Sequence, residues 1–494
     1  MKRNLTRRDF LRDGAALAAL LAASKPNVVL AAERVVAVQP SEKLRVAVIG
    51  LGGRGQDHLS GFAGKNGCEI AIVCDCDEGT AGRAITAVEK AQGKAPKFVK
   101  DLRAVMDDKS IDIVSIATPN HWHALAAIWA IQAGKHVYVE KPVSHNVSEG
   151  RRIVEAARKH NKICQTGTQS RSSVGMRKAI EFIHAGKIGK VSLARGLCYK
   201  LRGSIGVADG VQQPPRGLDY DIWCGPAPMD PIKRKKFHYD WHWIWNYGNG
   251  DLGNQGIHEM DKARWGLNKN EMPKSVVSLG GRFGYIDDGQ TANTQISLFD
   301  YGDAQLIFEV RGLPSKSPYP GKKSPQTQEK PTPFVGNIWY GTEGFVVCPN
   351  YTSGVAYRPD GEIIAEFSGG DDHYKNFVEA VRAGNHKLLN ADILEGHLSS
   401  ALCHLGNVSY QLGTAQPFNK QTNALGDNKE VVATFQSMQD HLKEKDLKLN
   451  EMEYRLGKKL IIDPKTELFV GDEGANKMLT REYRKGYEVP AKIS

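Results

Sequence analysis

Residues 43–55 read Lys43-Leu-Arg-Val-Ala-Val-Ile-Gly50-Leu-Gly-Gly-Arg-Gly55, an apolar β-branched run followed by a glycine-rich turn. The run predicts a buried strand, and the sequence after Gly55 predicts a helix that continues through His58 and Phe62. A G-x-G-x-x-G pattern between a strand and a helix is typical of dinucleotide-binding sites, because the free N–H groups at the helix N-terminus bind phosphate. The alternative is a glycine-rich turn with a purely structural role.

The glycines of this turn have separate roles in such a site. Gly50 allows the tight turn, Gly52 lets the backbone approach a pyrophosphate, and Gly55 lets the helix pack closely on the strand. The predicted cofactor-binding residues of the turn are Gly50, Gly52, Gly53, Arg54 and Gly55.

The choice of cofactor depends on Asp75, which ends the next predicted strand, residues 69–75. A dinucleotide fold places the acceptor for the adenosine ribose hydroxyls at this point, and a carboxylate there repels a 2′-phosphate. The sequence therefore favours NAD over NADP. Arg54 leaves NADP open as the alternative, because a guanidinium near Asp75 could accommodate the 2′-phosphate.

Strands and helices continue to alternate after Asp75, which predicts an α/β fold with a doubly wound parallel sheet. The predicted strands are 111–117, 136–140 and 163–166, and the predicted helices are 123–133 and 147–160. Ligands of such sheets bind at the carboxyl ends of the strands. The residues expected to face the cofactor there are Thr118, Pro119, Asn120, His123, Glu140 and Lys141.

Lys141 is the first candidate catalytic residue. It follows a predicted strand and precedes Pro142, so its amine is expected to project into the crevice. A lysine whose pKa is lowered by burial can exchange a proton with a carbinol as the carbon is oxidised. Without this setting, a surface lysine would be the ordinary interpretation.

A second candidate group lies in the stretch from Trp241 to Asp261. Asn254 and His258 are four residues apart and would share one face of a helix. His258 would be the second titratable group of a proton relay, and Asn254 could bind a sugar hydroxyl. Three tryptophans and one tyrosine of this stretch are expected either to stack on the apolar face of a sugar or to belong to the core: Trp241, Trp243, Trp245 and Tyr247. Trp243 and Trp245 are the predicted substrate-binding residues among them.

Composition excludes several other classes of protein. The 494 residues carry 66 basic and 55 acidic side chains, a net charge of +11, without a recognisable nucleic-acid-binding motif. No apolar run approaches the roughly 20 residues of a membrane helix. We expect a soluble chain with no nucleic-acid partner, no stable membrane insertion and no bound metal. The eight cysteines form no Cys-x-x-Cys pair and are interpreted as buried thiols.

The first 32 residues have the pattern of an export signal. Arg7 and Arg8 precede a Phe-Leu pair, a short apolar run and small residues near Ala32. Paired arginines in this context resemble a twin-arginine signal, which predicts a periplasmic or otherwise exported protein and the twin-arginine machinery as a partner. That route carries folded proteins, so a cofactor bound before export is expected. An uncleaved amphipathic helix is the alternative.

Several motifs together resemble the glucose–fructose oxidoreductase / inositol dehydrogenase / rhizopine-catabolism (Gfo/Idh/MocA) family. They are the Gly50–Gly55 turn, the Thr118-Pro-Asn stretch, Ala133-Gly-Lys-His-Val-Tyr-Val-Glu-Lys141-Pro and the Gly248–His258 run. The resemblance implies a Rossmann domain followed by an α/β domain with a large open, mostly antiparallel sheet. It also implies a homo-oligomer.

The resemblance implies catalysis by residues that map to Lys141, Asn254 and His258. Asn254 departs from the pattern, because many members have Asp there and an amide cannot take a proton. Asp251 and Asp261 are the nearby carboxylates that could substitute.

The predicted domains are a signal peptide at 1–32, a Rossmann domain at 43–166, a substrate and oligomerisation domain at 167–413, and an extension at 414–494. The second domain should contain strands at 276–279, 292–299, 305–310 and 344–347 and helices at 373–382 and 392–412. The extension, with a charged helix at 436–453, is expected to wrap the fold or contact another subunit; an unstructured tail is the alternative.

Three functions fit these observations. The first is an exported oxidoreductase that keeps NAD bound and acts on a sugar or glycoside in a redox-neutral or sugar-to-sugar hydride cycle. The second is an ordinary NAD-linked sugar or polyol dehydrogenase. The third is a carbohydrate-binding scaffold with a vestigial Rossmann site, for which Asn254 is the main support.

Overall fold

A computed structural model of the chain describes residues 43–315, 334–418 and 429–493. The predicted signal peptide, residues 1–32, lies outside the described residues. The chain from Lys43 onward forms one compact unit. Within the described residues, no helix combines the length and the apolar character needed to cross a membrane.

The first domain is built on a six-stranded parallel sheet in the order β3-β2-β1-β4-β5-β6, as the alternating pattern predicted. Its central strands are apolar and fully inaccessible over most of their length, so the sheet needs helices on both faces. The strands are β1 (Leu44–Ile49), β2 (Cys68–Cys74), β3 (Lys97–Val99), β4 (Ile113–Ile116), β5 (His136–Val139) and β6 (Cys164–Thr166). The helices are α2 (Gly53–Phe62), α3 (Ala81–Gln92), α4 (Arg103–Asp107), α5 (Asn120–Gln132) and α6 (Val147–Lys159).

The second sheet has twelve strands and is almost entirely antiparallel; β7 and β10 form its one parallel pair among the described strands. This confirms the predicted second α/β domain. Its path runs β14-β13-β12-β11-β7-β10-β9-β8-β16-β15, with β17 paired to β8 and β18. The strands are β7 (Val191–Tyr199), β8 (Ser275–Gly281), β9 (Thr294–Asp300), β10 (Gln305–Arg311), β11 (Phe334–Gly341), β12 (Gly344–Cys348), β13 (Gly354–Tyr357), β14 (Ile363–Phe367), β15 (Thr414–Pro417), β16 (Glu453–Leu456), β17 (Leu460–Asp463) and β18 (Leu468–Phe469).

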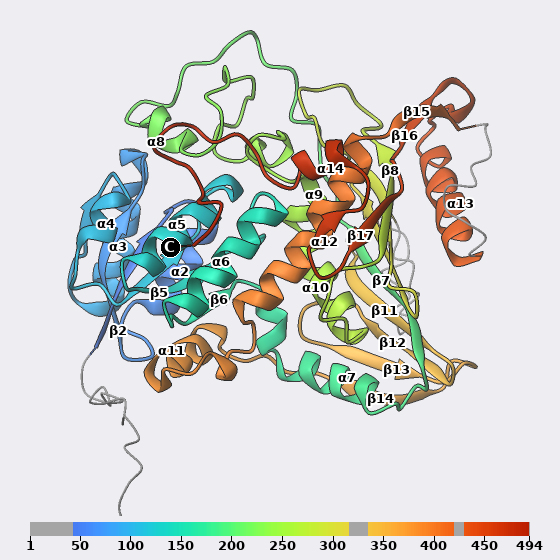
Figure 1. The fold of residues 1–494 in the computed structure, drawn as a ribbon, viewed down its shortest axis with the longest axis horizontal. Coiled ribbons are helices and arrows are strands. Elements are labelled where there is room, and N and C mark those ends of the chain that lie inside the picture. The colour runs from blue at the N-terminus through green and yellow to red at the C-terminus, as the bar shows by residue number, and fades with distance from the viewer. Residues whose placement is uncertain (1–42, 316–333, 419–428, 494) are drawn as a thin grey trace, which may run out of the picture. The chain divides into compact units, whose positions relative to one another are not determined.

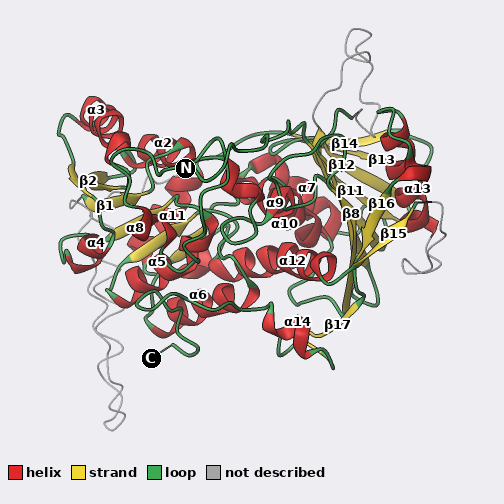
Figure 2. Ribbon diagram, turned by 90° about the horizontal axis from the view of Figure 1, so that it is seen from above, coloured by secondary structure: helices red, strands yellow, loops and turns green. Residues whose placement is uncertain are grey.

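Helices cover the large sheet unequally. One face packs against α7 (Val174–His184), α10 (Gly256–Gly266) and α12 (Ile393–Gln411), which lie on the side of the first domain (Figure 2). The other face carries α13 (Lys429–Lys443). Three short helices complete this part of the chain, α8 (Tyr220–Cys224), α9 (Gly250–Asn254) and α14 (Glu473–Lys477). The longer α11 (His373–Ala383) packs on the first domain.

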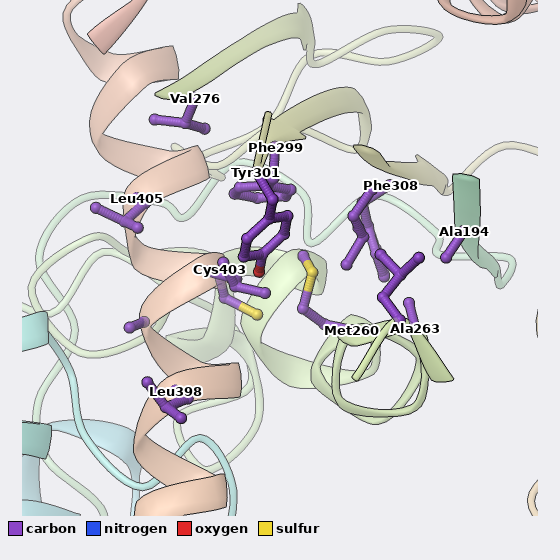
Figure 3. Packing of buried hydrophobic residues seen from close by; sticks show 14 of the residues in the cluster. Ala194, Met260, Ala263, Val276, Phe299, Tyr301, Phe308, Leu398, Cys403 and Leu405 are labelled. Atoms are coloured by element: carbon purple, nitrogen blue, oxygen red, sulfur yellow. The ribbon is translucent and has the colours of Figure 1, made fainter. Parts of the chain in front are cut away.

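The largest core cluster lies between α12, α10 and the large sheet (Figure 3). Cys403 and Leu398 come from α12, Met260 comes from α10, and Phe299 and Phe308 come from the sheet. All five are at most 3% exposed, so this interface holds α10 in a fixed position against the sheet. The eight cysteines are free thiols, seven of them buried.

The C-terminal extension corrects one predicted boundary. Its helix spans Lys429–Lys443 rather than 436–453, because the apolar face that packs on the sheet begins at Val431. The chain then turns at Asp446, whose φ is 59°, and residues 453–456 form strand β16. The end of the chain returns to the first domain, beside α5 (Figure 1). Tyr487 and Val489 belong to the core cluster of that domain.

Candidate active site

A cavity of about 450 Å³ lies at the carboxyl ends of the parallel strands. Its lining contains twelve of the residues that the sequence singled out. They are Gly50, Gly52, Gly53, Arg54, Asp75, Thr118, Pro119, Asn120, His123, Glu140, Lys141 and Asn254. Four others, Gly55, Trp243, Trp245 and His258, are not part of the lining.

The glycine turn leaves open space where a cofactor pyrophosphate would lie. A Cβ atom on Gly52 or Gly53 would meet no atom within 4 Å. Helix α2 begins at Gly53, beside this open space. Its N-cap residue is Gly52, and no side chain forms a capping hydrogen bond there. Uncapped N–H groups facing an open space fit a pyrophosphate well.

Gly50 and Gly55 hold the turn in shape. Gly50 has a φ of 87°, which favours glycine, and a Cβ on it would lie 2.6 Å from the carbonyl oxygen of Ala117. A Cβ on Gly55 would lie 2.0 Å from the carbonyl oxygen of Gly50. Gly55 is therefore required for close packing of α2 on β1, not for direct contact with a ligand.

We expect Gly55→Ala to lower the free energy of unfolding by about 1–3 kcal/mol, because the new methyl group overlaps the backbone of Gly50. Gly53→Ala is the matched control: it faces open space and should leave stability within about 0.5 kcal/mol of the wild type, while weakening NAD binding. Urea unfolding and NAD titration measure both effects. Equal stability of the two variants would contradict this account of the turn.

Asp75 lies at the end of β2 and is held by the backbone. Its carboxylate accepts the N–H of Leu51 at 2.8 Å and the N–H of Asp77 at 3.0 Å. Burial raises the pKa of this carboxyl group. Asp75 is thus fixed beside the glycine turn, in the position that a ribose hydroxyl acceptor requires.

Arg54 is bound to two carboxylates. Its Nε donates to Glu140 at 2.8 Å, and its Nη1 donates to Asp57 at 2.8 Å. These bonds tie the guanidinium to Glu140 and Asp57, so the geometry gives no support for Arg54 as a partner of a 2′-phosphate beside Asp75.

Glu140 is a buried anion in the cavity lining that binds several neighbouring groups. Besides Arg54, it contacts Nε2 of His58 at 3.2 Å and accepts the backbone N–H of Lys141 at 3.2 Å. Burial alone would raise the pKa of Glu140, but Arg54 and His58 hold it well below its ordinary value. Glu140 is therefore ionised and acts as a fixed negative charge next to Lys141.

Lys141 projects its amine into the cavity, followed by a cis bond to Pro142. Its Nζ donates to the backbone carbonyl oxygen of Asn254 at 3.0 Å, which fixes the amine between the two domains. Burial lowers the pKa of Lys141, and the charge of Arg54 acts in the same direction, against that of Glu140. A lysine with a lowered pKa can serve as a proton acceptor and donor.

Asn254 and His258 do not share one helix. Helix α9 ends at Asn254, and α10 begins at Gly256, which packs so closely on Phe308 that a Cβ would lie 2.9 Å from its ring. Asn254 reaches the cavity and binds Lys141 through its backbone oxygen. His258 instead turns toward Tyr351, at a ring distance of 4.9 Å.

His258 keeps one unsatisfied ring nitrogen. Its Nδ1 is buried and has no hydrogen-bond partner within the described part of the chain. Burial lowers its pKa well below the ordinary value, and the nearby charge of Lys141 adds to this. His258 is therefore a neutral group that lies behind the cavity lining.

Neither of the carboxylates that could replace Asn254 is available. Asp251 accepts two bonds of 2.7 Å from Arg202. Asp261 is bound by Arg171 through contacts of 2.8 to 3.0 Å. Each carboxylate compensates an arginine, so neither replaces Asn254 as a proton acceptor.

Tyr239 and His242 line the cavity beside Trp241, although the sequence did not point to either as a site residue. Trp241 and His242 stack at 3.7 Å, and burial lowers the pKa of His242 to about 3. The 3₁₀ turn Asp240–Trp243 points Trp241 and His242 inward. Trp243 packs beneath Arg202 instead, at 5.6 Å. The sequence feature that could have pointed to these residues is the cluster of His and Trp side chains at 238–243.

Two models of one oxidoreductase family match this chain. Residues 44–168 match its NAD-binding Rossmann fold, and residues 181–319 match its C-terminal α/β domain. Together they cover more than half of the sequence. The protein is thus an oxidoreductase by family, with an NAD-binding Rossmann domain. It belongs to the Gfo/Idh/MocA family.

Curated relatives match about a third of the chain. Inositol 2-dehydrogenase of Salmonella typhimurium is 32% identical over 158 residues, 32% of this chain and 46% of that protein. Alpha-N-acetylgalactosaminidase of Shewanella oneidensis is 34% identical over 179 residues, 33% of this chain and 39% of that protein. The match thus spans less than half the length of either relative.

Solved structures share the fold at low identity. Levoglucosan dehydrogenase in complex with NADH and levoglucosan gives a TM-score of 0.53 at 18% identity, covering 74% of this chain and 96% of that one. The WlbA dehydrogenase of Bordetella pertussis in complex with NADH and UDP-GlcNAcA gives 0.52 at 20% identity, covering 74% and 95%.

Proposed function

We propose that the protein is an exported NAD-dependent oxidoreductase that acts on a sugar or glycoside. The observation that carries this proposal is the position of Lys141, whose amine reaches the same cavity as the open glycine turn and Asp75. A binding scaffold would not need a lysine of lowered pKa at this point. The family supports the oxidoreductase class.

NAD supplies a hydride acceptor when it is bound. Lys141, in its neutral form, accepts the proton of a substrate hydroxyl and later returns it as the ammonium. The negative charge of Glu140 favours this ammonium, and the carbonyl oxygen of Asn254 orients it. Asn254 is thus a positioning residue through its backbone oxygen, so an amide in place of a carboxylate is compatible with catalysis.

The substrate class follows from the cavity walls. Trp241, Trp223 and Trp122 supply aromatic surface, and Asn120 and His242 supply hydrogen-bonding groups. Flat apolar rings beside polar side chains are suited to a sugar ring, whose C–H face is apolar and whose rim carries hydroxyls. The names of the relatives, which refer to inositol and N-acetylgalactosamine, support a cyclic polyol or sugar.

We propose further that the cofactor stays bound and that the hydride returns to the same or a second sugar. A twin-arginine signal supports this, because that route exports folded proteins and free NAD is scarce outside the cytoplasm. The competing function is an ordinary dehydrogenase that exchanges its cofactor. Residues 1–42, which carry the signal, lie outside the described residues.

Turnover without added cofactor separates these two functions. The purified mature protein is incubated with a panel of aldoses, ketoses and glycosides, and products are measured by mass spectrometry. Many product molecules per chain with no added NAD support the captive cycle. Product that stops at one per chain and resumes only with added NAD would favour the ordinary dehydrogenase.

Export and assembly have separate tests. Changing Arg7 and Arg8 to lysine in the full-length chain is expected to retain the protein in the cytoplasmic fraction, whereas periplasmic recovery of that variant would overturn the export proposal. We also propose a homo-oligomer, supported by the family resemblance; a monomer in analytical ultracentrifugation would contradict it.

A further inference from the structure

The last part of the chain has no role in the proposed function. We call residues 479–489 the C-terminal segment; the two family models end at residue 319 and do not reach it. The segment follows α14 and runs past α8 to α5 of the first domain (Figure 1). Tyr487 and Val489, near its end, are buried. The chain thus places its C-terminal segment against elements that form the candidate active site.

Helix α8 supplies part of the wall of the active-site cavity. Ile222 and Trp223 of α8 line the cavity beside Trp122 of α5. The indole N–H of Trp122 donates to the carbonyl oxygens of Ile222 at 2.9 Å and Trp223 at 3.1 Å. Gly225, which ends α8, packs so closely on Trp122 that a Cβ would lie 2.2 Å from the indole. Helix α8 and Trp122 therefore form one aromatic wall.

This wall lies at the end of the cavity that is expected to bind adenosine. Asp219, the N-cap of α8, donates its backbone N–H to the carbonyl oxygen of Cys76 at 2.9 Å. Cys76 lines the cavity directly after Asp75, the predicted acceptor for the adenosine ribose. The position of α8 therefore sets the shape of the cavity at the adenosine end.

Arg484 of the C-terminal segment binds α8 at both ends. Its Nη1 donates to the carbonyl oxygen of Asp221 at 3.0 Å and to that of Gly225 at 3.2 Å. Its Nη2 forms an ion pair with the carboxylate of Asp221. Neither Arg484 nor Asp221 belongs to the cavity lining. Arg484 can thus influence the cavity only through α8.

Tyr487 joins α8 to the other half of the wall. Its hydroxyl donates to Oδ2 of Asp221 at 3.2 Å, and its ring meets that of Trp122 edge-on at 5.6 Å. The guanidinium of Arg484 lies 5.2 Å from the same ring. Because Tyr487 is only 6% exposed and belongs to the core of the first domain, it holds both parts of the wall in place.

We propose that the C-terminal segment is part of the NAD site, with Arg484 and Tyr487 as positioning residues for its adenosine end. They fix α8 and Trp122, so the wall is already in place when NAD binds. A wall that is fixed in advance slows dissociation, because the ligand leaves only when the wall moves. The inference rests on the NAD binding of the proposed function, and it gives the slow release of a captive cofactor a structural cause.

The test measures how fast NADH leaves the protein. The purified protein is saturated with NADH and mixed with excess NAD, and the loss of protein-bound NADH fluorescence gives the dissociation rate. Arg484→Gln should raise this rate about tenfold or more, because it removes the charged contacts with α8. Tyr487→Phe keeps the ring and removes only the bond to Asp221, so it should raise the rate by a smaller factor.

Arg152→Gln is the matched control. Arg152 donates to the carbonyl oxygen of Ala491 at 2.9 Å, so it holds the chain beyond the residues that contact α8. This variant should release NADH at the wild-type rate. Arg484→Gln should lower the melting temperature by no more than about 3 °C, because the side chain of Asp221 is 55% exposed and water screens the ion pair.

The outcomes separate the inference from the proposed function. Release of NADH by Arg484→Gln at the wild-type rate, or equal acceleration by Arg152→Gln, would overturn the inference and leave the proposed function intact. If Arg484→Gln does not fold, Asp221→Asn removes the same ion pair from the side of α8. Faster release by that variant supports the inference, and the wild-type rate overturns it. A wild-type protein that binds no NADH would overturn both.

Discussion

Lys141→Met is expected to lower kcat by about 10²- to 10⁴-fold, the contribution of a positioned acid–base group. Methionine keeps the length and the apolar stem of the side chain but cannot carry a proton. NAD affinity should change little, because the glycine turn and Asp75 are untouched. Lys94→Met, which removes an exposed lysine bound to Glu69, is the matched control and should retain full activity.

The pH profile identifies the group more directly. Oxidation of a hydroxyl needs neutral Lys141, so the rate should rise with pH through the pKa of this lysine, which burial places below its ordinary value of 10.5. The reverse reaction needs the ammonium and should fall over the same interval. The rise of the oxidation rate and the fall of the reverse rate should both disappear in Lys141→Met. An unchanged profile in the variant would assign the proton transfer to another residue.

Asp261→Ala is expected to reduce the free energy of unfolding by about 3 kcal/mol, the loss typical of breaking a buried ion pair. Asp261 is fully buried and accepts bonds from Arg171 and from the hydroxyl of Ser399. Its removal leaves Arg171, itself 4% exposed, with Glu395 as its remaining carboxylate. Urea unfolding followed by circular dichroism measures the change.

The control for Asp261 is an exposed pair of the same type. Asp303 binds Lys269 at 2.7 Å but its side chain is 64% exposed. Asp303→Ala should cost no more than about 1 kcal/mol, because water screens the pair. Similar losses in the two variants would show that the Arg171–Asp261 contact contributes no more than a surface ion pair.

The first domain could be predicted because its signals are local. The run before Gly50 is apolar and β-branched, and the chain then alternates between short strands and helices. Residues that follow strands in a parallel sheet meet at one edge, so Asp75, Thr118 and Lys141 could be placed together without knowledge of their contacts. The structure brings all three to one cavity.

Tertiary packing decided the features that the sequence left open. The spacing of Asn254 and His258 predicts one helical face, but a turn at Gln255 separates α9 from α10. Similarly, a 3₁₀ turn rather than an α-helix aims Trp241 and His242 at the cavity and buries Trp243 elsewhere. No short window of sequence signals either outcome.

The extension shows the same limit. Charge and length suggested a helix at 436–453, whereas the apolar face of α13 is chosen by the sheet beneath it, through Val431, Met438 and Leu442. The pairing of β16 with β8, more than 170 residues earlier in the chain, has no local signature.

The central claim is that this chain binds NAD in the cavity that contains Lys141. The test is to purify the protein as it is expressed, denature it and identify the released nucleotide by mass spectrometry. We expect NAD at close to one molecule per chain. An empty protein that also fails to bind added NAD in a titration would contradict it.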